Sequence, residues 1–537
     1  MSIQIEKIAE HKQQFQTEKM KVPVVLHIND ALLPEESTLL QLESVASNDC
    51  CFHHIAGMAD VHSKPGRKNA TGTTVTSEKF ILPQVNDSDP ACGMRLIRTN
   101  LTEDNITPEE LDKLFKELVY KVPTKKYVGT YVPFRVVVDI CRKGIGPLID
   151  HLGIKTKFEK ENALGGENFF TTGHPELVSG SHTRQDSSKS NGMLKQVQHD
   201  NVREAQDNSI PSQQDIFNII PKLFLFFAQF RLGILGAAGN HFLDLMKVTD
   251  IEDPETAEKL GIKKGQYLFM VHCGSGILGQ YTMYMYTAKK REHLSTAILM
   301  NIGRFFWNTP FKKTINAIAQ KIRQSDFGKK EALITFDGAG DDGKLYMAAR
   351  NACSNFAHAN RAVIAHNVGE TIQKVLGRDA ELELLYDMPH ILVSQEEHFG
   401  KNIWVHRNGT SRAYGPSRMK DHPLFGQTGE PAFIPSSMST EAYLCVGTDG
   451  NESSFYSCNH GAGKAAKKTE AIVPESQEEL HKKLESKGVH LYNGQSKKVI
   501  EQDSSHYKRV EDVIAGVKAN NIVKPVAKMQ PVSIIMY

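Results

Sequence analysis

Apolar residues along this chain follow two periods, one typical of helices and one typical of strands. Between 344 and 377 they recur every three or four positions, which predicts one long helix. The same spacing predicts shorter helices over 256–262 and 476–488. Runs rich in β-branched and aromatic residues predict strands over 131–140, 266–273, 331–336 and 402–407. Helices and strands that alternate without a repeat period predict a mixed α/β fold.

One stretch breaks this pattern. Residues 167–214 are rich in Ser, Asn, Gln, Asp and His and poor in periodic apolar positions. Such a segment buries too little apolar surface to offset the entropy that it would lose on ordering. We therefore expect an exposed and mobile insertion, whose histidines are solvated rather than bound to a metal.

Length and charge limit the classes of function. With 537 residues, the chain can form several average domains or one large elaborated domain. Its 64 lysines and arginines nearly cancel its 62 aspartates and glutamates. The global positive field of many nucleic-acid-binding proteins is therefore absent, and any anionic partner has to be held by a local patch.

The cysteines and the N-terminus indicate a compartment. The eight cysteines show no regular framework, which favours reduced thiols over disulfides. The first 21 residues are charged throughout and lack the apolar core of a signal peptide. No apolar run approaches the roughly 18 residues that a membrane span needs. The sequence predicts a soluble cytoplasmic protein without a membrane partner.

One short segment places a histidine among small residues. His460 is followed by Gly461, Ala462, Gly463 and Lys464. Small neighbours let other atoms approach the imidazole, glycines permit unusual backbone conformations, and the lysine offers a charge for a phosphate. A glycine-rich turn with an incidental histidine would look the same, so the segment alone does not decide between a reactive and a structural residue.

Potential metal ligands recur near predicted strand ends and glycine turns. Asp89 and Cys92 share a Pro/Gly loop that can bend both side chains toward one ion, and His241, His272 and His390 lie near other such turns. A mixed set of oxygen, sulfur and nitrogen donors suits Mn, Fe, Co or Zn better than Mg. Because the five residues are widely scattered, their spacing alone leaves structural or solvated histidines as the alternative.

A rival interpretation involves a nucleotide cofactor. Gly274, Gly276 and Gly279 follow a predicted strand with the spacing of a dinucleotide-binding loop. The segment after them lacks a clear second strand that ends in an acidic residue. This pattern is therefore weak evidence for an NAD(P)- or flavin-dependent enzyme.

Several motifs occur in a fixed order along the chain. They are Asp60-Val61-His62, Asp89-x-x-Cys92-Gly93-Met94-Arg95, Gly239-Asn240-His241-Phe242-Leu243, His272-x-Gly274-Ser275, Asn355-Phe356-Ala357-x-Ala359-Asn360-Arg361, Pro435-x-Ser437-Met438 and His460-Gly461-Ala462-Gly463. In this order they resemble the RtcB family of RNA-splicing ligases, from about Ile55 to Pro531 apart from the insertion. The resemblance implies one large α/β catalytic domain over 1–537.

The resemblance also implies an activity. Members of this family use GTP and manganese to join an RNA 2′,3′-cyclic phosphate or 3′-phosphate end to a 5′-hydroxyl end, in tRNA splicing or RNA repair. It implies that Cys92 bridges two manganese ions, one also held by Asp89 and His241 and the other by His272 and His390. The implied nucleotide contacts are Asn240, His241, Asp244, His390, Pro435, Ser437, Met438, His460, Gly461, Ala462 and Gly463. His460 would be the catalytic residue, which attacks the GTP α-phosphate and forms a covalent guanylate.

The chain departs from the family pattern near the nucleotide and the RNA. The departures are Cys273 for serine, Gly276 and Lys464 for arginine, Ile391 for asparagine, Asp244 for glutamate, and an end at Tyr537 in place of Lys-Gly. Lysine keeps the charge of arginine but not its bidentate grip on phosphate. Two alternatives therefore remain: a paralogue that guanylylates or caps other RNA 3′-phosphate ends, and a non-catalytic RNA-binding relative.

Basic residues outside these departures are candidates for contacts with RNA phosphates. The candidates are Lys64, Arg67, Lys68, Arg407 and Arg412. For each of them, the alternative is an ordinary surface charge that contacts only solvent.

We expect the protein to be a monomer.

Overall fold

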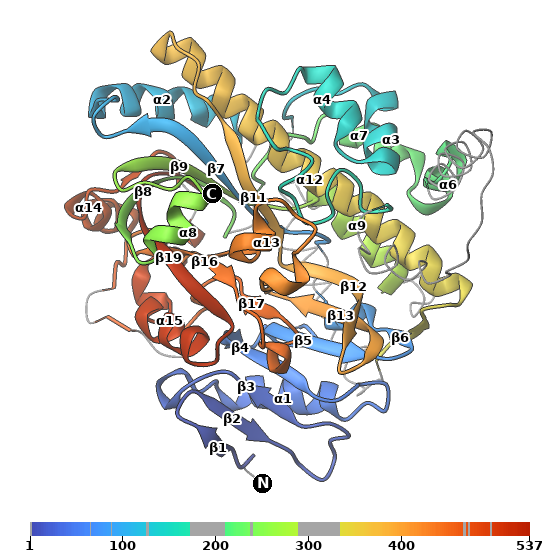
Figure 1. The fold of residues 1–537 in the computed structure, drawn as a ribbon. Coiled ribbons are helices and arrows are strands. Elements are labelled where there is room, and N and C mark those ends of the chain that lie inside the picture. The colour runs from blue at the N-terminus through green and yellow to red at the C-terminus, as the bar shows by residue number, and fades with distance from the viewer. Residues whose placement is uncertain are drawn as a thin grey trace, which may run out of the picture.

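The computed structural model describes residues 3–64, 66–86, 89–124, 128–171, 210–236, 240–287, 333–465, 469–470, 473–494 and 497–536. These residues form two large sheets with helices packed around them (Figure 1). The predicted mixed α/β fold is confirmed. No helix in these ranges combines the length and the apolar character needed to cross a membrane.

The first sheet has seven strands and contains the N-terminus, at the bottom of Figure 1. In spatial order its strands are β1 (Glu6–Ala9), β2 (Lys12–Phe15), β3 (Val24–Leu26), β4 (Ile55–His62), β5 (Thr71–Ser77), β13 (Lys401–Asn408) and β12 (Ile391–His398). Strands β3 and β4 are parallel, and the other neighbours are antiparallel. The predicted strand over 402–407 is confirmed as part of β13.

The second sheet has eight strands and carries most of the potential metal ligands. In spatial order its strands are β11 (Glu383–Pro389), β7 (Gly93–Thr102), β9 (Gln266–Cys273), β8 (Phe242–Ile251), β19 (Val523–Met536), β16 (Ala442–Gly447) and β15 (Pro431–Ile434), and β18 (His490–Leu491) pairs with β19. Two short pairs complete the strands: β6 (Phe80–Ile81) with β10 (Phe336–Asp337), and β14 (Thr410–Arg412) with β17 (Ser457–Asn459). The predicted strand over 266–273 is confirmed as β9.

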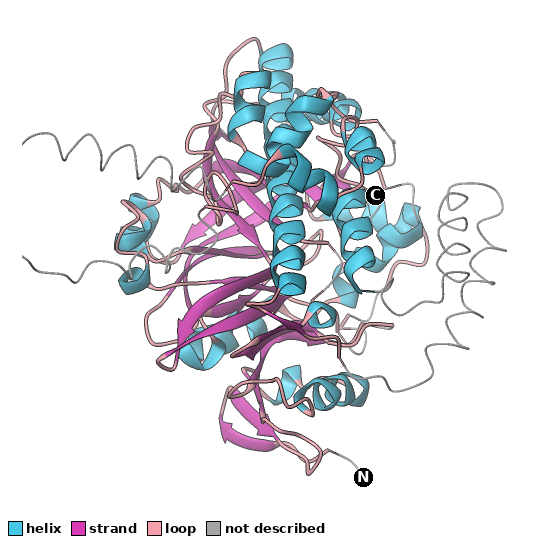
Figure 2. Ribbon diagram, turned by 90° about the vertical axis from the view of Figure 1, so that its right-hand side faces the viewer, coloured by secondary structure: helices cyan, strands magenta, loops and turns pink. Residues whose placement is uncertain are grey.

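The helices pack mainly around the second sheet, and Figure 2 shows several of them gathered on one side of the strands. They are α1 (Glu36–Ala46), α2 (Pro108–Lys121), α3 (Phe134–Lys143), α4 (Gly146–Leu152), α6 (Gln213–Ile219), α7 (Lys222–Ala228), α8 (Pro254–Lys259), α9 (Gly276–Thr287), α12 (Asp341–Leu376), α13 (Phe425–Thr428), α14 (Gln477–Ser486) and α15 (Val510–Ala519). The predicted long helix is α12, and α8 and α14 match the two shorter predicted helices.

Helix α12 is the central support of the fold. It packs against α2, α3, α9 and strand β9, and its middle turns are buried all round. A helix buried on every side loses the amphipathic pattern of a surface helix. It ends where Gly377 takes a left-handed conformation with φ +65°, the usual way to satisfy the last carbonyls of a helix.

Two predictions about secondary structure are wrong in whole or part. Residues 131–140 do not form a strand, because helix α3 begins at Phe134, directly after Pro133, and its Val137 and Ile140 pack beside α12. Tertiary packing here outweighs the strand propensity of a valine run. In the predicted strand over 331–336, positions 331 and 332 lie outside the described residues, positions 333–335 form no strand, and Phe336 enters β10.

The predicted mobile insertion over 167–214 is too wide at both ends. The Asn168 side chain accepts a 2.9 Å hydrogen bond from Asn355 of α12, and Ser212 caps helix α6. Both flanks therefore belong to the packed fold. The central part, 172–209, lies outside the described residues.

The buried His406 predicts how acid destabilises the fold. Its Nδ1 donates to the Val75 carbonyl at 3.1 Å, while its Nε2 accepts from the Leu82 amide at 2.9 Å. Burial lowers the pKa of His406 to about 3. Because the unfolded state takes up a proton near pH 6.5 and the folded state does not, stability falls as pH drops below 6.5, by about 2 kcal/mol at pH 5.

We expect the His406→Gln variant to lose about 2 kcal/mol less than the wild type between pH 7 and pH 5. Urea unfolding at the two pH values measures this difference. His490→Gln provides the control, because it replaces an exposed histidine instead of a buried one. An equal pH dependence in wild type and His406→Gln would refute the assignment.

Candidate active site

Strand register brings the potential metal ligands together at one end of the second sheet. Cys92 directly precedes β7, His241 directly precedes β8, His272 lies near the end of β9, and His390 follows β11. Adjacent strands place Met94 and Phe242 opposite His272. Four loops that are far apart in the sequence therefore meet at a single point.

Cys92 lies at the centre of these residues. Its Sγ is 3.4 Å from His241 Nε2 and 3.6 Å from His272 Nε2, and His272 Nε2 is 3.0 Å from His390 Nε2. Two groups of potential ligands result, Asp89 with Cys92 and His241, and Cys92 with His272 and His390. Within each group the donor atoms lie within 4.8 Å of one another. A thiolate shared by two such groups is suited to bridging two cations.

Backbone carbonyls fix the orientation of two of these imidazoles. His241 Nδ1 donates to the Leu235 carbonyl at 2.7 Å, and His272 Nδ1 donates to the Asn240 carbonyl at 2.8 Å. The Nε2 lone pairs of both rings therefore point toward Cys92. Burial lowers the pKa of His241, and it lowers those of His272 and His390 well below 6.5. All three rings are therefore neutral at pH 7, as metal binding requires.

Asp89 is held by the turn that follows β9. Its Oδ1 accepts hydrogen bonds from the Ser275 amide at 2.9 Å and the Ser275 hydroxyl at 2.5 Å. A side chain at Gly274 would collide with this carboxylate. The glycine pattern at 274–279 therefore makes room for Asp89. Because β9 is antiparallel to both neighbours, β7 and β8, the dinucleotide-binding interpretation is not supported.

A buried network of charged side chains holds the loops that carry the potential metal ligands. Arg361 of α12 donates to both Asp387 oxygens and to the carbonyls of Ala91 and Cys273. Arg95 donates to Asp387 from the other side at 2.8 Å. Although burial alone would raise it, the two guanidinium groups lower the pKa of Asp387. Arg361 thereby fixes the loops before Cys92 and after His272.

We expect Arg361→Met to lower the free energy of unfolding by about 3–5 kcal/mol, because it removes one partner of a buried ion pair. Chemical denaturation measures the loss. Lys116→Met is the matched control, since its pair with Asp112 is exposed and contributes at most about 1 kcal/mol. Equal stability of Arg361→Met and the control would contradict this role.

Two asparagines of α12 anchor further loops. Asn360 accepts from the amides of Gly233 and Ile234 and donates to the Gly274 carbonyl. Asn355 accepts from the Phe169 amide at 2.9 Å. These polar residues of α12 are buried and hold the loops of the site in place.

His460 lies directly after β17, with its ring centroid 4.5 Å from that of His390. Its Nδ1 lies 2.7 Å from both Asp60 Oδ2 and the Gly409 carbonyl. Both partners are acceptors, so Nδ1 carries the proton and Nε2 keeps a lone pair. Asp60 is fully buried. A buried carboxylate beside an imidazole orients the ring and stabilises positive charge that develops on it.

One cavity of about 580 Å³ connects these features. It is lined by every residue that the family resemblance assigns to metal or nucleotide: Asp89, Cys92, Asn240, His241, Asp244, His272, His390, Pro435, Ser437, Met438, His460, Gly461, Ala462 and Gly463. Its size suits a small-molecule ligand. The sequence motifs thus describe one continuous surface, although the residues come from distant parts of the chain.

Asp244 is an unusual polar group in this cavity. It is buried, and its Oδ1 has no hydrogen-bond partner among the described residues. Burial raises its pKa well above the ordinary value of a carboxyl. A buried polar atom without a protein partner is costly unless a ligand satisfies it.

Three of the positions that depart from the family pattern line this cavity, namely Asp244, Ile391 and Lys464. Lys464 Nζ donates to the Glu501 carbonyl and to Gln502, and it lies 3.9 Å from the centroid of the Tyr507 ring. Gly276 has a φ of +59° and open space where a side chain would be. Tyr537 lies outside the described residues.

Two of the predicted RNA-phosphate contacts are wrong. Arg407 is fully buried and pairs with both oxygens of Glu396, and Arg412 pairs with the buried Glu430. Neither is a solvated surface charge, because each is neutralised inside the fold. Lys64 and Arg67 do line the cavity.

Sequence patterns did not reveal some residues of the site. Asp60 was part of a motif without a stated role, and its partner His460 is 400 positions away. Ser275 was likewise part of a motif without a stated role, and the Gly409 carbonyl carries no sequence signal of its own. The only sequence pattern that pointed to Asp60 was its place in the motif Asp60-Val61-His62.

The fold and the site are those of a mixed α/β protein in which two groups of potential metal ligands and an accessible histidine share one cavity. Residues 41–536 match the family model of the tRNA-splicing ligase RtcB, and the chain therefore belongs to the RtcB family.

Similar proteins carry the name tRNA-splicing ligase RtcB. The chain is 27% identical to that of Methanococcus maripaludis over 531 residues, which are 96% of this chain and 95% of the relative. It is 28% identical to that of Nanoarchaeum equitans over the full length of both. It is also 28% identical to that of Pyrococcus horikoshii over 455 residues, which are 82% of this chain but 44% of that protein.

Proposed function

We propose that this protein is a GTP- and manganese-dependent RNA ligase. It joins RNA that ends in a 2′,3′-cyclic phosphate or 3′-phosphate to RNA that begins with a 5′-hydroxyl, in tRNA splicing or RNA repair. The observation that carries the proposal is the bond from His460 Nδ1 to Asp60, which leaves Nε2 as a nucleophile in the cavity that holds both ligand groups.

The donor set fits two manganese ions. Asp89, Cys92 and His241 would hold one ion, and Cys92, His272 and His390 would hold the other. Neutral imidazoles, a thiolate and a carboxylate suit a borderline divalent metal. When bound, the metal would supply positive charge against the phosphates of GTP and RNA.

His460 forms the covalent bond in this scheme. Its Nε2 attacks the α-phosphorus of GTP, the N–P bond forms, and pyrophosphate leaves. Water opens any 2′,3′-cyclic phosphate at its P–O2′ bond, which leaves a 2′-hydroxyl and a 3′-phosphate. An oxygen of the 3′-phosphate then attacks the phosphorus bound to His460, which breaks the N–P bond and frees the imidazole. The 5′-hydroxyl finally attacks the activated 3′-phosphate and GMP leaves. Asp60 keeps Nδ1 protonated and opposes the positive charge on the ring while the N–P bond forms and while it breaks.

The rest of the cavity would bind the nucleotide. Asp244 offers an unsatisfied oxygen, which could accept a hydrogen bond from an N–H group of the base. Ser437 is held by Thr440 at 2.9 Å on the same wall. Lys464 follows His460 by four positions and offers a positive charge for a phosphate. Its Nζ also donates to the Glu501 carbonyl.

A ligation assay tests this function. Purified protein with GTP and manganese should join a 3′-phosphate RNA to a 5′-hydroxyl RNA and release GMP. Omission of either GTP or the metal should abolish the product. A joined product that forms equally without GTP would refute the proposed reaction.

The open space at Gly276 favours one second candidate. The family has arginine at this position, and glycine cannot make the phosphate contact that an arginine could make. The enzyme would then guanylylate or cap other RNA 3′-phosphate ends. Accumulation of guanylylated RNA without joining, under the conditions of the ligation assay, would support this candidate over the first.

A further inference from the structure

The strand that carries Asp60 loses support from its neighbours just before it reaches this residue. Strand β3 pairs with β4 over 55–57, and the pairing of β4 with β5 is irregular between Gly57 and His62. The main chain around Asp60 therefore receives less support from the sheet than the earlier part of β4. Carbonyl groups that are buried at such a point need another hydrogen-bond donor.

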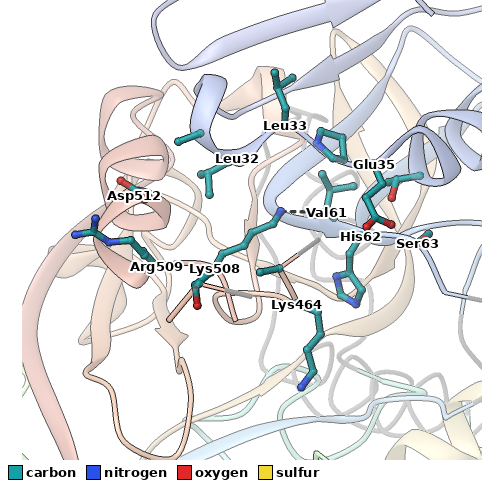
Figure 3. Close-up of a pocket in the computed structure, with 15 residues that line it drawn as sticks. Leu32, Leu33, Glu35, Val61, His62, Ser63, Lys464, Lys508, Arg509 and Asp512 are labelled. Carbon is teal, nitrogen blue, oxygen red and sulfur yellow. Dashed lines mark hydrogen bonds between the residues drawn. The ribbon is translucent and has the colours of Figure 1, made fainter. Parts of the chain in front are cut away.

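Lys508 supplies this donor. Its Nζ donates to the carbonyls of Ala59 at 2.8 Å and Val61 at 3.0 Å, on either side of Asp60. Figure 3 shows the Lys508 side chain reaching the main chain at Val61. Burial lowers the pKa of Lys508 to about 8 and the charge of Asp60 opposes this shift, so the ammonium group is mostly protonated at pH 7. Lys508 thus takes the place of a neighbouring strand at this point.

The main chain of Lys508 holds the loop that follows His460. Its N–H donates to the Gly463 carbonyl at 3.0 Å. Gly463 has a φ of +76°, and a side chain there would come within 2.6 Å of the Asp60 carbonyl oxygen. The loop therefore lies directly against the main chain of Asp60. One residue, Lys508, links the strand that carries Asp60 to the loop after His460.

The carboxylate of Asp60 has few supports of its own. Its Oδ2 is 2.7 Å from His460 Nδ1, while its buried Oδ1 has no hydrogen-bond partner among the described residues. The main chain therefore sets the position of the carboxylate. The Asp60 carbonyl accepts from His62 Nδ1 at 2.7 Å, and Lys508 holds the carbonyls before and after it. A displacement of about 1 Å at a catalytic group can slow a reaction about 10²-fold.

We propose that Lys508 is a positioning residue for the transfer of the nucleotide: it holds Asp60 against His460 Nδ1 and so keeps the Nε2 lone pair directed at the nucleotide. Lys508 does not line the active-site cavity, so it acts through Asp60 and not by contact with the substrate. This inference rests on the proposed function, because the attack by His460 Nε2 is the step that it assists.

Lys508→Met tests this role, because it removes the ammonium group and keeps the main-chain N–H. Guanylylation of His460 should slow about 10- to 100-fold, whereas the KM for GTP and the affinity for manganese should not change. Lys508→Arg should recover most of the rate, because a guanidinium group offers several donors and the side chain borders a cavity of about 470 Å³.

Lys524→Met is the matched control for this variant. The Lys524 Nζ also donates within the fold, to Thr256 Oγ1 at 3.2 Å, but Lys524 lines neither this cavity nor the active-site cavity. Its guanylylation rate should equal that of the wild type. A loss in Lys524→Met as large as in Lys508→Met would count against a specific role for Lys508.

A double-mutant cycle separates this role from a general structural effect. If Lys508 acts through Asp60, Lys508→Met should slow guanylylation at most about twofold in a protein that already carries Asp60→Asn. A general defect would lower the rate by the same factor in both backgrounds, and that result would overturn the proposal. Lys508→Gln keeps a polar amide at this position and provides the same cycle if Lys508→Met does not fold.

Proton NMR of histidine-labelled protein separates this proposal from the proposed function, because it needs neither GTP nor metal. Charge-assisted hydrogen bonds are strong, so the His460 Nδ1 proton should resonate far downfield in the wild type and move upfield in Lys508→Met. His460→Ala assigns the signal. This shift, reversed in Lys508→Arg, supports the positioning role even if the wild type forms no guanylate. An unchanged signal together with normal guanylylation in Lys508→Met refutes the positioning role and leaves the ligase function intact.

Discussion

Cys92→Ser is expected to lower the affinity for manganese by a factor of about 10² or more. The Cys92 Sγ belongs to both groups of potential ligands, so its loss weakens two ion sites together. Loss of a residue that only supports a metal ligand already costs 10- to 100-fold. Titration calorimetry with Mn²⁺ measures the affinity, and the metal content of the purified protein gives a second readout.

Cys50→Ser is the control for this prediction, because Cys50 is half-buried and does not line the active-site cavity. It should bind manganese as the wild type does. Unchanged manganese affinity in Cys92→Ser would exclude a bridging role for the thiolate. A loss of affinity in the control of the same size would show that the effect is not specific to the site.

His460→Ala is expected to abolish the covalent guanylate completely, since it removes the nucleophile. Asp60→Asn should keep the acceptor oxygen near Nδ1 but lose the negative charge, and guanylylation should slow by a factor on the order of 10²–10⁴. Retention of radioactivity from α-labelled GTP on denatured protein measures both variants.

The exposed His490 supplies the control for His460, and His490→Ala should be labelled as fast as the wild type. Full labelling of His460→Ala would place the nucleotide on another residue. A normal rate in Asp60→Asn would mean that the carboxylate does not assist the imidazole.

Local sequence patterns predicted much of the fold but failed for segments whose secondary structure is set by tertiary packing. The long helix α12 could be predicted because its apolar segment is long and free of proline, and strand β9 because its apolar run is short and nearly continuous. The valine run in α3 looks like a strand, and only its burial beside α12 explains the helix. Such tertiary effects leave no signal within a short window of sequence.

In the candidate site too, sequence motifs identify some residues, and only the folded structure identifies the others. Asp89, Cys92 and His460 stand in recognisable motifs, and the structure places them on one cavity. The pairing of His460 with Asp60 depends on strands that meet only in the folded chain. Arg407, read as a candidate RNA contact, is neutralised by Glu396. Charge alone does not reveal whether a side chain is on the surface.

The central claim is that His460 carries the nucleotide during the reaction. Incubation of the wild type with α-labelled GTP and manganese, followed by proteolysis and mass spectrometry, tests it most directly. The account predicts one GMP per chain, attached to the peptide that contains His460 and released by acid, as a phosphoramidate should be. A GMP on any other residue, or no covalent GMP in protein that binds manganese, would contradict the account.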